Sequence, residues 1–470
     1  MKIIHVSAEC YPIAKVGGLA DVVGALPKYQ NSAETSSQVL MPFYKNKFTQ
    51  DHKFKTVYEG DLEMGISSIS FKILVPENVD LGFEVYLVDI PELLYTEYVY
   101  SERDTERFLS FQIAALDWII QNEQLPDIIH CHDHHTGLIP FMMSHVNKYK
   151  KLKNKASVFT IHNAQYQGWF SHDKINLIPA FPSSHIGLLD WGNCINPLAT
   201  AIKCAWQITT VSPSYMEELK HKANGLESLI SSESQKCTGI LNGIDTKVWD
   251  PETDDMITEK YGISDCDSGK QSSKDWLCKK FGLNPEKPLF VFIGRLVEEK
   301  GADLFSEVFD KALTNLDISI LLLGSGNKML EEGLSKLTNK FSKKYNAFIG
   351  YDEELSHKMY AGGDFLLMPS WVEPCGLNQM YSLRYGTIPI VNKIGGLKDT
   401  VVDVSEGGFG FVHTDNTVDG IYNSIKRATQ FYSDSSKVKK TRKTIMKIDH
   451  SWDESAQQYI NLYKSLIQYS

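Results

Sequence analysis

Short apolar runs and amphipathic segments alternate along most of the chain. The runs at residues 2–6, 128–131, 289–293 and 365–368 have the length and largely apolar character of strands buried in a parallel sheet. Between such runs, apolar residues recur at helical spacing, as they do across 102–122. This repetition of strand, loop and helix predicts doubly wound α/β sheets, whose ligands bind where strand ends meet helix starts.

The alternation is interrupted by a polar segment at residues 246–288. Because 470 residues exceed the usual size of one domain, we interpret this segment as the start of a second domain. We predict two Rossmann-like domains, 1–245 and 246–451, that face each other across a deep cleft. Residues 452–470 have the pattern of an amphipathic helix, which we expect to pack back on the first domain.

The second domain contains a glutamate beside two glycine turns. Glu373 and Gly376 lie in the loop that follows one predicted strand. Gly395 and Gly396 form the turn after the next strand, and we predict that a helix starts at Leu397. Glycine turns that open onto helix N-termini present free backbone N–H groups, which favour phosphate. A glutamate beside two such turns indicates that a positive charge and a diphosphate are handled together.

Basic residues lie near glycines in both predicted domains. In the first, Lys15 precedes Gly17 and Gly18 at the start of a predicted helix, although so short a pattern also fits a solvated lysine. In the second, Arg295 and Lys300 follow a predicted strand. Two cations without matching carboxylates facing them favour an anionic ligand. The alternative is that Arg295 and Lys300 form ion pairs with the two glutamates that lie between them in the sequence.

Histidines crowd the end of the predicted strand at 128–131. His132, His134 and His135 follow one another closely, and one interpretation is a metal site. Ligands so close together in one extended loop cannot all converge on an ion, so we predict no metal. The alternative is a loop whose polar groups hydrogen-bond a polyol. A second polar and aromatic loop, at 162–168, follows the next strand and also suits sugar hydroxyls.

Composition argues against several classes of function. The formal net charge of −10 and a pI near 5.8 disfavour nucleic acid or an anionic membrane as the main partner. The 8 cysteines are scattered, and we find no apolar run long enough to span a membrane, so we expect a cytoplasmic protein. A nicotinamide oxidoreductase is disfavoured because no GxGxxG follows the first strand.

The chain also carries a series of longer motifs. They are KVGGLADV at 15–22, HDHHTG at 132–137, HNAQYQG at 162–168, TVSP at 210–213, GLE at 225–227, ILNGID at 240–245, RLVEEKG at 295–301 and EPCGL at 373–377. In this order, and over nearly the whole chain, they resemble bacterial glycogen synthases and plant starch synthases. The resemblance implies a GT-B fold and transfer of glucose from ADP-glucose to the non-reducing end of an α-1,4-glucan. It further implies retention of configuration and no metal or other cofactor.

The resemblance extends to individual residues. Glu373 and His135 are similar to residues that flank the transferred glucose, and Arg295 and Lys300 to diphosphate contacts, and we predict that these four are catalytic. The donor-binding residues that it implies are Lys15, Gly18, Asp21, Asn242, Tyr351 (which would stack on adenine), Cys375, Gly376, Leu377, Gly395 and Gly396. Those that it implies on the acceptor side are His162, Asn163, Tyr166 and Gln167.

Three segments depart from the family pattern. His134 stands where the family usually has tryptophan, and Ala164 and Gln165 stand where it has Leu-Ala. Both changes lie on the expected acceptor side, so they bear on glucan preference. Residues 28–38 replace a usual small-residue helix end, which we interpret as a local change of the surface.

Two other functions and a second mechanism fit part of the sequence. A GT-B enzyme that uses UDP-glucose or a different small acceptor is the main alternative, because nucleobase choice rests on backbone contacts. A non-catalytic glucan-binding protein would not need Glu373 and the cations. No convincing pair of carboxylates flanks the site, so we expect same-face attack assisted by the departing phosphate. Glu373 and His135 would then position and polarise the reacting groups rather than attack the sugar.

Overall fold

The computed structural model describes residues 1–468 and divides into two compact units. Unit 1 comprises Met1–Gly243 together with the C-terminal segment that begins at Trp452, and unit 2 comprises Ile244–Ser451. The C-terminal segment forms α17 (Trp452–Ile467); the last two positions of the helix predicted at 452–470 lie outside the described residues. Within those described residues, no helix is both long and apolar enough to cross a membrane.

Unit 1 is built on a 9-stranded sheet with the order β3-β4-β5-β2-β1-β6-β7-β8-β9. Pairing is parallel from β5 to β9, whereas β4 pairs antiparallel with both β3 and β5. The strands are β1 (Lys2–Val6), β2 (Ser36–Pro42), β3 (Phe54–Met64), β4 (Ser67–Pro76), β5 (Glu84–Asp89), β6 (Ile128–His132), β7 (Ala156–Ile161), β8 (Gln207–Thr210) and β9 (Cys237–Gly239).

The strand order of unit 1 reverses at β1. The chain leaves β1 towards β2 on one side and later returns to add β6 on the other side, so the loops after β1 and β6 diverge. Such a reversal leaves a crevice at the carboxyl ends of the two strands, which is where open α/β sheets bind ligands. The loops that contain Lys15 and His135 both begin here.

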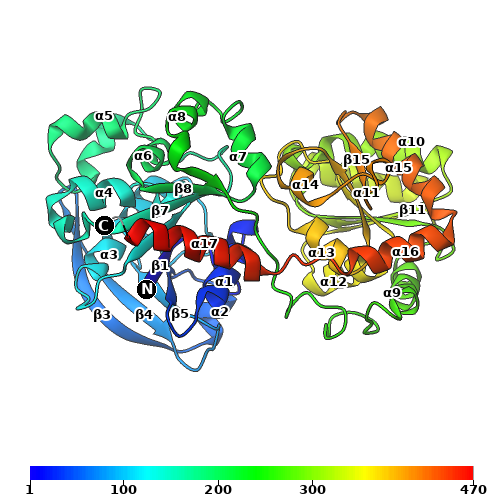
Figure 1. The fold of residues 1–470 in the computed structure, drawn as a ribbon, viewed down its shortest axis with the longest axis horizontal. Helices are drawn as coiled ribbons and strands as arrows, with labels where there is room; N and C mark the ends of the chain where they lie inside the picture. Colours follow the sequence, from blue (N-terminus) through cyan, green and yellow to red (C-terminus); the bar gives the residue numbers. More distant parts are fainter. Residues whose placement is uncertain (469–470) are drawn as a thin grey trace. The chain divides into compact units, whose positions relative to one another are not determined.

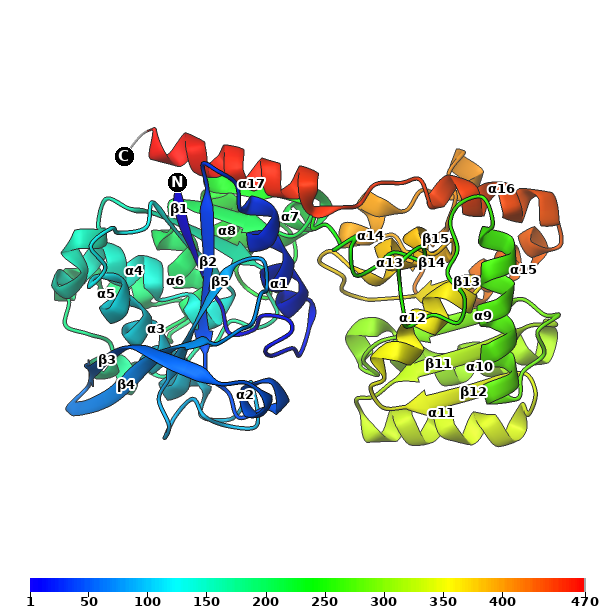
Figure 2. The ribbon, with the colours of Figure 1, turned by 90° about the horizontal axis from the view of Figure 1, so that it is seen from below.

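The C-terminal helix completes a core of unit 1. Its apolar face presents Trp452, Ala456, Tyr459 and Tyr463, which are buried against residues of β1, β6, β7 and α1. Figures 1 and 2 show α17 running beside α1. The other helices of this unit are α1 (Gly18–Gln30), α2 (Lys47–Asp51), α3 (Asp104–Ile119), α4 (Ile139–His145), α5 (Ile186–Leu189), α6 (Pro197–Cys204), α7 (Pro213–Leu219) and α8 (Glu227–Ser232).

Unit 2 is built on a 6-stranded parallel sheet with the order β12-β11-β10-β13-β14-β15. Numbered within the unit, this is the order 3-2-1-4-5-6 of dinucleotide-binding folds, and it reverses between β10 and β13. The strands are β10 (Leu289–Ile293), β11 (Ser319–Gly324), β12 (Tyr345–Ile349), β13 (Phe365–Met368), β14 (Ile388–Asn392) and β15 (Phe411–His413).

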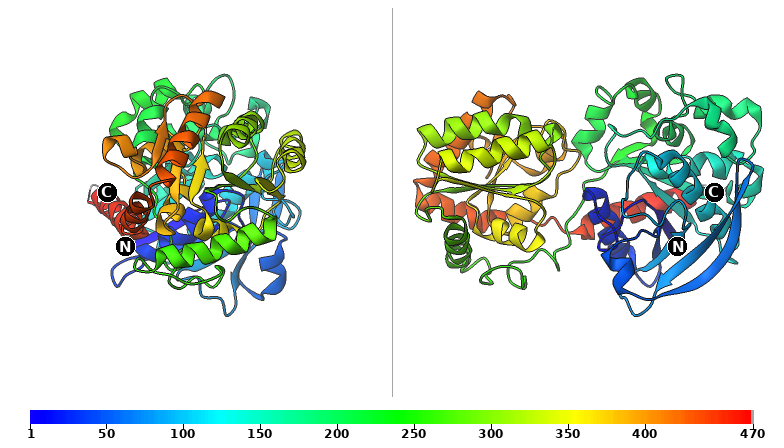
Figure 3. Two further views of the ribbon diagram at one scale, coloured as in Figure 1. Left: turned by 90° about the vertical axis from the view of Figure 1, so that its right-hand side faces the viewer. Right: turned by 180° about the vertical axis from the view of Figure 1, so that it is seen from behind.

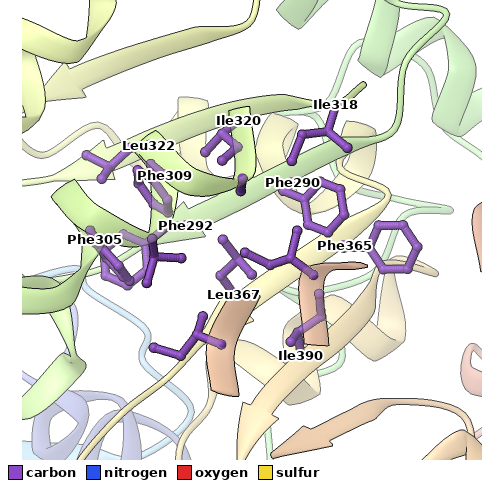
Figure 4. Close-up of a cluster of buried hydrophobic side chains, with 14 of the residues drawn as sticks. Phe290, Phe292, Phe305, Phe309, Ile318, Ile320, Leu322, Phe365, Leu367 and Ile390 are labelled. Atoms are coloured by element: carbon purple, nitrogen blue, oxygen red, sulfur yellow. The ribbon is translucent and has the colours of Figure 1, made fainter. Parts of the chain in front are cut away.

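Helices cover both faces of this sheet (Figure 3). On one face, alternate strand residues such as Phe290, Phe292 and Leu367 pack against Phe305 and Phe309 of α10, as Figure 4 shows. The helices are α9 (Cys266–Phe281), α10 (Phe305–Asn315), α11 (Lys328–Lys340), α12 (Glu353–Gly362), α13 (Asn378–Arg384), α14 (Gly395–Thr400), α15 (Val418–Tyr432) and α16 (Ser435–Ile445).

Two expectations from the sequence were wrong in detail. The glycine pair at Gly395 is not a turn before a helix, because α14 already begins at Gly395. The segment 28–38 is not a surface change alone, since Gln30 is fully buried. The polar segment after residue 246, for which no helix was predicted, contains α9, in which Lys270 and Lys274 are buried.

Candidate active site

The loops at the strand reversal of unit 2 bring Lys300 and Glu373 together. Lys300 Nζ lies 2.8 Å from Glu373 Oε1 and 2.7 Å from Oε2, and Ser370 Oγ donates a hydrogen bond of 2.9 Å to Oε2. Glu373 is 8% exposed, so the carboxylate is held by these groups in largely buried surroundings. The expectation that no carboxylate faces the two cations was therefore wrong for Lys300.

Arg295 lies in the same loop but has a different partner. Its Nη2 lies 3.1 Å from Glu299 Oε2, and its side chain is 47% exposed. The sequence left ion pairs with the neighbouring glutamates open as an alternative, and Arg295 forms one of them. An exposed pair of this kind contributes about 0–1 kcal/mol, so the guanidinium can exchange its partner for an anionic ligand at little cost.

Glycines allow α14 to approach the loop that carries Glu373. Gly395 has φ +41°, and a Cβ there would collide with the carbonyl oxygen of Glu373. A Cβ at Gly396 would collide with the carbonyl oxygen of Cys375. The N–H of Gly396 donates a hydrogen bond of 3.1 Å to the Glu373 carbonyl. Because neither glycine has a side chain, the start of α14 can pack directly against the backbone of the Glu373 loop.

The start of α13 is fixed to the sheet by amide side chains. Leu377 is the N-cap residue, and Asn378 Nδ2 donates a hydrogen bond of 2.7 Å to the carbonyl oxygen at the end of β10. Gln379 Nε2 donates to the carbonyl oxygens of Cys375 and Gly376 at 3.1 and 2.8 Å. These contacts hold the EPCGL loop in one conformation beside the strand reversal.

Tyr351 follows β12, near the edge of the unit 2 sheet. Tyr351 is 73% exposed. The residue before it, Gly350, has a φ of 150°, which a residue with a side chain rarely adopts. An exposed aromatic ring at a strand end offers a flat apolar face to a planar ligand.

In unit 1, two of the predicted donor-binding residues contact each other. Lys15 Nζ lies 2.7 Å from Oδ1 of Asp21, which is in the first turn of α1. Glu9 holds the loop that contains Lys15. Its Oε2 accepts hydrogen bonds from the N–H groups of Val16 and Gly17 at 2.5 and 3.0 Å. Tyr100 donates a short hydrogen bond to the other Glu9 oxygen. Burial raises the pKa of Glu9, against these hydrogen bonds.

A cavity of about 500 Å³ borders this loop of unit 1. Lys15, Val16, Tyr98 and Tyr100 are among the residues that line it. Tyr98 is 69% exposed, so the cavity has an aromatic face at its rim. Gly18, which we also expected at the donor site, is the first residue of α1.

His135 is enclosed by aromatic rings. It stacks on Tyr100 with ring centroids 4.7 Å apart and meets the edge of Phe108 at 4.5 Å. Burial lowers the pKa of His135 far below the usual value, so the ring is neutral. Among the described residues, His135 Nδ1 and Asn242 Oδ1 are buried without a hydrogen-bond partner. A polar ligand could satisfy either of these atoms.

Asp133 fixes the start of the 162–168 loop. Its Oδ1 accepts a hydrogen bond of 2.7 Å from the N–H of His162, and the N–H of Asn163 also donates to this carboxylate. Burial raises the pKa of Asp133 to about 7, although these two bonds oppose the rise. Asp133 has φ 56°, a strained conformation for a residue with a side chain.

His134 supports the other end of the same loop. A Cβ at Gly168, which has φ +68°, would collide with the His134 ring. The backbone of Tyr166 hydrogen-bonds the His134 side chain, and the ring of Tyr166 is half-exposed. Gln167 Nε2 donates to the carbonyl oxygen of Asn224 at 3.0 Å. The histidine that departs from the family pattern is therefore part of the support of the predicted acceptor loop.

Three buried histidines of unit 1 could in principle hold a metal ion. Each of His5, His130 and His132 has a ring nitrogen within 4.8 Å of the others. Convergence of three histidines was not expected from the sequence, because His5 comes from β1 and joins the other two only through the pairing of β1 with β6. These nitrogens are already hydrogen-bonded, however: His5 Nδ1 to His132 Nε2 at 3.0 Å, and His130 Nδ1 to Tyr463 at 2.6 Å.

Glu9, Asp133 and Ser370 were missed by the sequence reasoning. Each lies within a few residues of the end of a central strand, where site residues of such sheets concentrate. Their position was therefore a usable signal. Their partners, which are backbone N–H groups and a carboxylate, were not visible in the sequence.

Comparison with known proteins identifies both halves of the chain. Residues 2–232 match the family described as starch synthase catalytic domain, and residues 274–444 match glycosyl transferases group 1. A glycogen synthase of Flavobacterium johnsoniae is 52% identical over 471 residues, covering 100% of both chains. A glycogen synthase of Streptococcus agalactiae is 36% identical and covers 99% of this chain.

Solved structures agree with these matches. The catalytic domain of starch synthase IV from Arabidopsis thaliana, bound to ADP and acarbose, is 31% identical, with a TM-score of 0.91 and 99% of each chain covered. Sucrose-phosphate synthase from Thermosynechococcus elongatus, 16% identical with a TM-score of 0.65, shares the fold. The predicted GT-B architecture of two doubly wound units is thereby confirmed. The chain belongs to the glycogen and starch synthase family of glycosyltransferases.

Proposed function

We propose that this glycosyltransferase moves glucose from ADP-glucose to the non-reducing end of an α-1,4-glucan with retention of configuration. The observation that carries the proposal is the cluster of Lys300, Glu373 and Ser370 at the strand reversal of unit 2, with Arg295 in the same loop. Support for the substrates comes from the glycogen synthases named above and from the ADP in the starch synthase structure.

The charge distribution suits departure of a diphosphate. As the bond between glucose C1 and the diphosphate oxygen breaks, negative charge grows on that oxygen. Lys300 and Arg295 supply positive charge in unit 2, and Lys15 supplies it in unit 1. Preorganised donors of this kind typically each contribute a factor of about 10²–10³ to the rate. We propose that these cations make a metal ion or other cofactor unnecessary.

The contacts of Glu373 favour same-face attack over a covalent intermediate. Lys300 contacts both carboxylate oxygens, and Ser370 donates to one of them, so the group is engaged rather than free to attack C1. In the proposed step the acceptor O4 bonds to C1 on the face that the diphosphate leaves. The O4 proton passes to the departing phosphate oxygen, so no protein nucleophile is consumed.

The remaining predicted residues have roles that fit this reaction. We propose that Tyr351 stacks on the nucleobase and that the 162–168 loop, supported by Asp133 and His134, contacts the glucan. The cysteines of the described chain are free thiols, which fits a reducing compartment, and we propose that the enzyme is cytoplasmic.

The decisive experiment compares glucose transfer to glycogen from ADP-glucose and from UDP-glucose at equal concentration, with EDTA present. We expect rapid chain growth from ADP-glucose, little from UDP-glucose, and no loss of rate with the chelator. Preference for UDP-glucose would overturn the donor assignment, and a rate abolished by EDTA would overturn the metal-free reaction. Hydrolysis of the donor without chain growth would overturn the acceptor.

A further inference from the structure

A continuous chain of hydrogen bonds crosses the buried interior of unit 1 from Gln30 to His162. Gln30 Oε1 lies 2.8 Å from His5 Nε2, and His5 Nδ1 lies 3.0 Å from His132 Nε2. His132 Nδ1 then lies 3.0 Å from His162 Nε2. The chain links the C-terminal end of α1 to the first residue of the 162–168 loop through β1 and β6.

The number of protons on the rings is fixed by burial. Burial lowers the pKa of His5 to about 4 and that of His162 to about 3, and it lowers the pKa of His132 well below the usual value. Each ring is therefore neutral near pH 7 and carries one N–H. Each nitrogen–nitrogen contact of 3.0 Å then needs the N–H of one ring and the lone pair of the other.

Gln30 sets the direction in which these protons point. A carbonyl oxygen can only accept, so His5 Nε2 must donate to Gln30 Oε1. His5 Nδ1 is then a bare acceptor, which requires His132 Nε2 to donate to it. By the same argument His162 Nε2 donates to His132 Nδ1, and the last nitrogen, His162 Nδ1, is left with a lone pair.

Two hydroxyl groups complete the contacts of the Gln30 amide. Ser37 Oγ donates a hydrogen bond of 2.8 Å to Gln30 Oε1. Gln30 Nε2 donates to the hydroxyl of Tyr463, on α17, at 3.3 Å. Gln30 and Ser37 both lie in the 28–38 segment that departs from the family pattern.

His162 is where the chain of hydrogen bonds reaches the predicted acceptor loop. The side chain is 8% exposed, and among the described residues no hydrogen bond to its Nδ1 is seen. We propose that Gln30 is a positioning residue that holds His162 in the Nε2–H tautomer, so that Nδ1 accepts a hydrogen bond from a sugar hydroxyl. The proposal rests on the glucan-transfer function above, and it assigns Gln30 a role at a distance from the substrate.

Two variants separate the effect of Gln30 on the direction of the hydrogen bonds from the effect of its side-chain packing. Gln30→Met keeps a similar volume but removes the acceptor, so nothing sets the direction of the chain. Gln30→Glu keeps an acceptor towards His5: as a carboxylate it can only accept, and as a carboxylic acid its O–H can replace the amide N–H that faces Tyr463. Gln38→Met is the matched control, because Gln38 is buried on β2 and bonds Glu84 outside the histidine chain.

The tautomers are read directly by ¹⁵N NMR of histidine-labelled full-length protein, before and after addition of maltotetraose. We expect His5, His132 and His162 as Nε2–H tautomers in the wild type and in Gln30→Glu. In Gln30→Met we expect mixed tautomers and a kcat about tenfold lower, the effect of one hydrogen bond. Gln38→Met should match the wild type in both measurements.

The results that would overturn the proposal do not depend on the transfer assay. An Nδ1–H tautomer of His162 in the wild type would overturn it even if no variant folds. Unchanged tautomers in Gln30→Met would do the same, as would displacement of the ring protons by stoichiometric Zn²⁺. Failure of the proposed function would look different, since the wild type would then show the expected tautomers without transferring glucose.

Discussion

At the scale of single residues, the central feature of unit 2 is Lys300, which contacts a carboxylate that also accepts a hydrogen bond from Ser370. We expect Lys300→Ala to lower the rate of glucose transfer by about 10²–10³, because a preorganised positive charge is lost from the leaving diphosphate. The measurement is kcat with ADP-glucose and glycogen, together with co-sedimentation on glycogen, which should change little.

A surface lysine provides the control for this variant. Lys311 of α10 pairs with Asp419 of α15, both of whose side chains are exposed, and Lys311→Ala should leave kcat within twofold of the wild type. Near-normal turnover in Lys300→Ala would show that its charge is not used in the reaction.

A backbone contact beside Glu373 gives a second prediction at this scale. Gly395→Ala places a methyl group against the carbonyl oxygen of Glu373, which must move. We expect unit 2 to lose about 1–3 kcal/mol of stability and kcat to fall at least tenfold, since a displacement of about 1 Å can cost that much. Urea unfolding and steady-state kinetics measure the two effects.

The helix α11 contains a glycine that should behave in the opposite way. At Gly333 a Cβ would make an ordinary contact, 3.4 Å from Ser306 Oγ, inside the helix. Gly333→Ala should therefore stabilise the unit by about 0.5–1 kcal/mol without changing kcat. If both glycine variants behaved alike, the close approach at Gly395 would not matter.

At the scale of elements, α9 shows a helix held by buried charge. Lys274 Nζ lies 2.8 Å from Asp364, and Arg442 of α16 bonds the same carboxylate. Asp364 also accepts from the N–H of Leu289 at 2.8 Å. Burial raises the pKa of Asp364, but the two cations and this bond outweigh it, so the pKa is lowered. The network joins α9 and α16 to the sheet.

Removing one member of this network should be costly. We expect Lys274→Met to destabilise unit 2 by about 3–5 kcal/mol, because Asp364 is left buried with less compensation. Lys279→Met, on the exposed side of the same helix, should change stability by about 0.5 kcal/mol or less. Urea unfolding curves of both variants provide the test, and similar curves would mean that the buried pair contributes no more than surface charge.

The same helix shows what the sequence could and could not predict. The strands at 289–293 and 365–368 were predicted at their observed bounds, because continuous apolar runs report burial directly. The helix α9 was not, because its buried face carries Lys270 and Lys274, whose partners are far away in sequence. Local periodicity detects apolar burial but not buried polar networks.

The same limit applies to the candidate site. Glu373, Lys300 and Arg295 could be placed at strand ends from the sequence, because strand ends are visible as the ends of apolar runs. The contact between Lys300 and Glu373 joins residues 73 positions apart, and no local pattern shows it. The histidine chain was missed for the same reason, since His5 joins it only through the pairing of β1 with β6.

At the scale of the whole molecule, the two units repeat one arrangement with different chemistry. Both have a sheet whose central strands are parallel and whose order reverses beside its first strand, and both carry candidate residues in the loops there. Unit 2 has charged pairs in the loops at its strand reversal. Unit 1 instead has buried, neutral histidines on the central strands beside its strand reversal. The units should therefore differ in how their stability depends on pH.

The difference follows from the direction of the pKa shifts in unit 1. Burial lowers the pKa of all the histidines in one group: that of His5 and His134 to about 4, that of His162 to about 3, and those of His130, His132 and His135 well below the usual value. Between pH 6.5 and about 4 the unfolded chain binds protons that these rings do not. Their stabilisation is complete above about pH 6.5 and is lost as the pH falls, by up to about 1.4 kcal/mol per pH unit for each ring.

Four carboxyl groups of unit 1 act in the opposite sense. Burial raises the pKa of Asp133 to about 7 and also raises those of Glu9, Asp89 and Asp117, so these groups favour the folded state as the pH falls. These carboxyl groups are fewer than the histidines with lowered pKa, so the net effect of acidification on unit 1 is a loss of stability. In unit 2 burial lowers the pKa of His413 and His450, which gives a smaller effect of the same sign. We therefore expect unit 1 to lose stability first on mild acidification.

Pulsed hydrogen exchange can follow each unit separately. The protein is equilibrated in urea at pH 7, 6 and 5, labelled briefly at one fixed pH, and analysed by mass spectrometry of peptides from each unit. We expect the urea midpoint of β6 and β7 peptides to fall steeply between pH 6.5 and 5, and that of β10 and β13 peptides to fall much less. Parallel loss in both units would mean that the buried histidines are not the dominant acid-sensitive groups. A midpoint for unit 1 that rose on acidification would mean that the carboxyl groups with raised pKa outweigh the histidines.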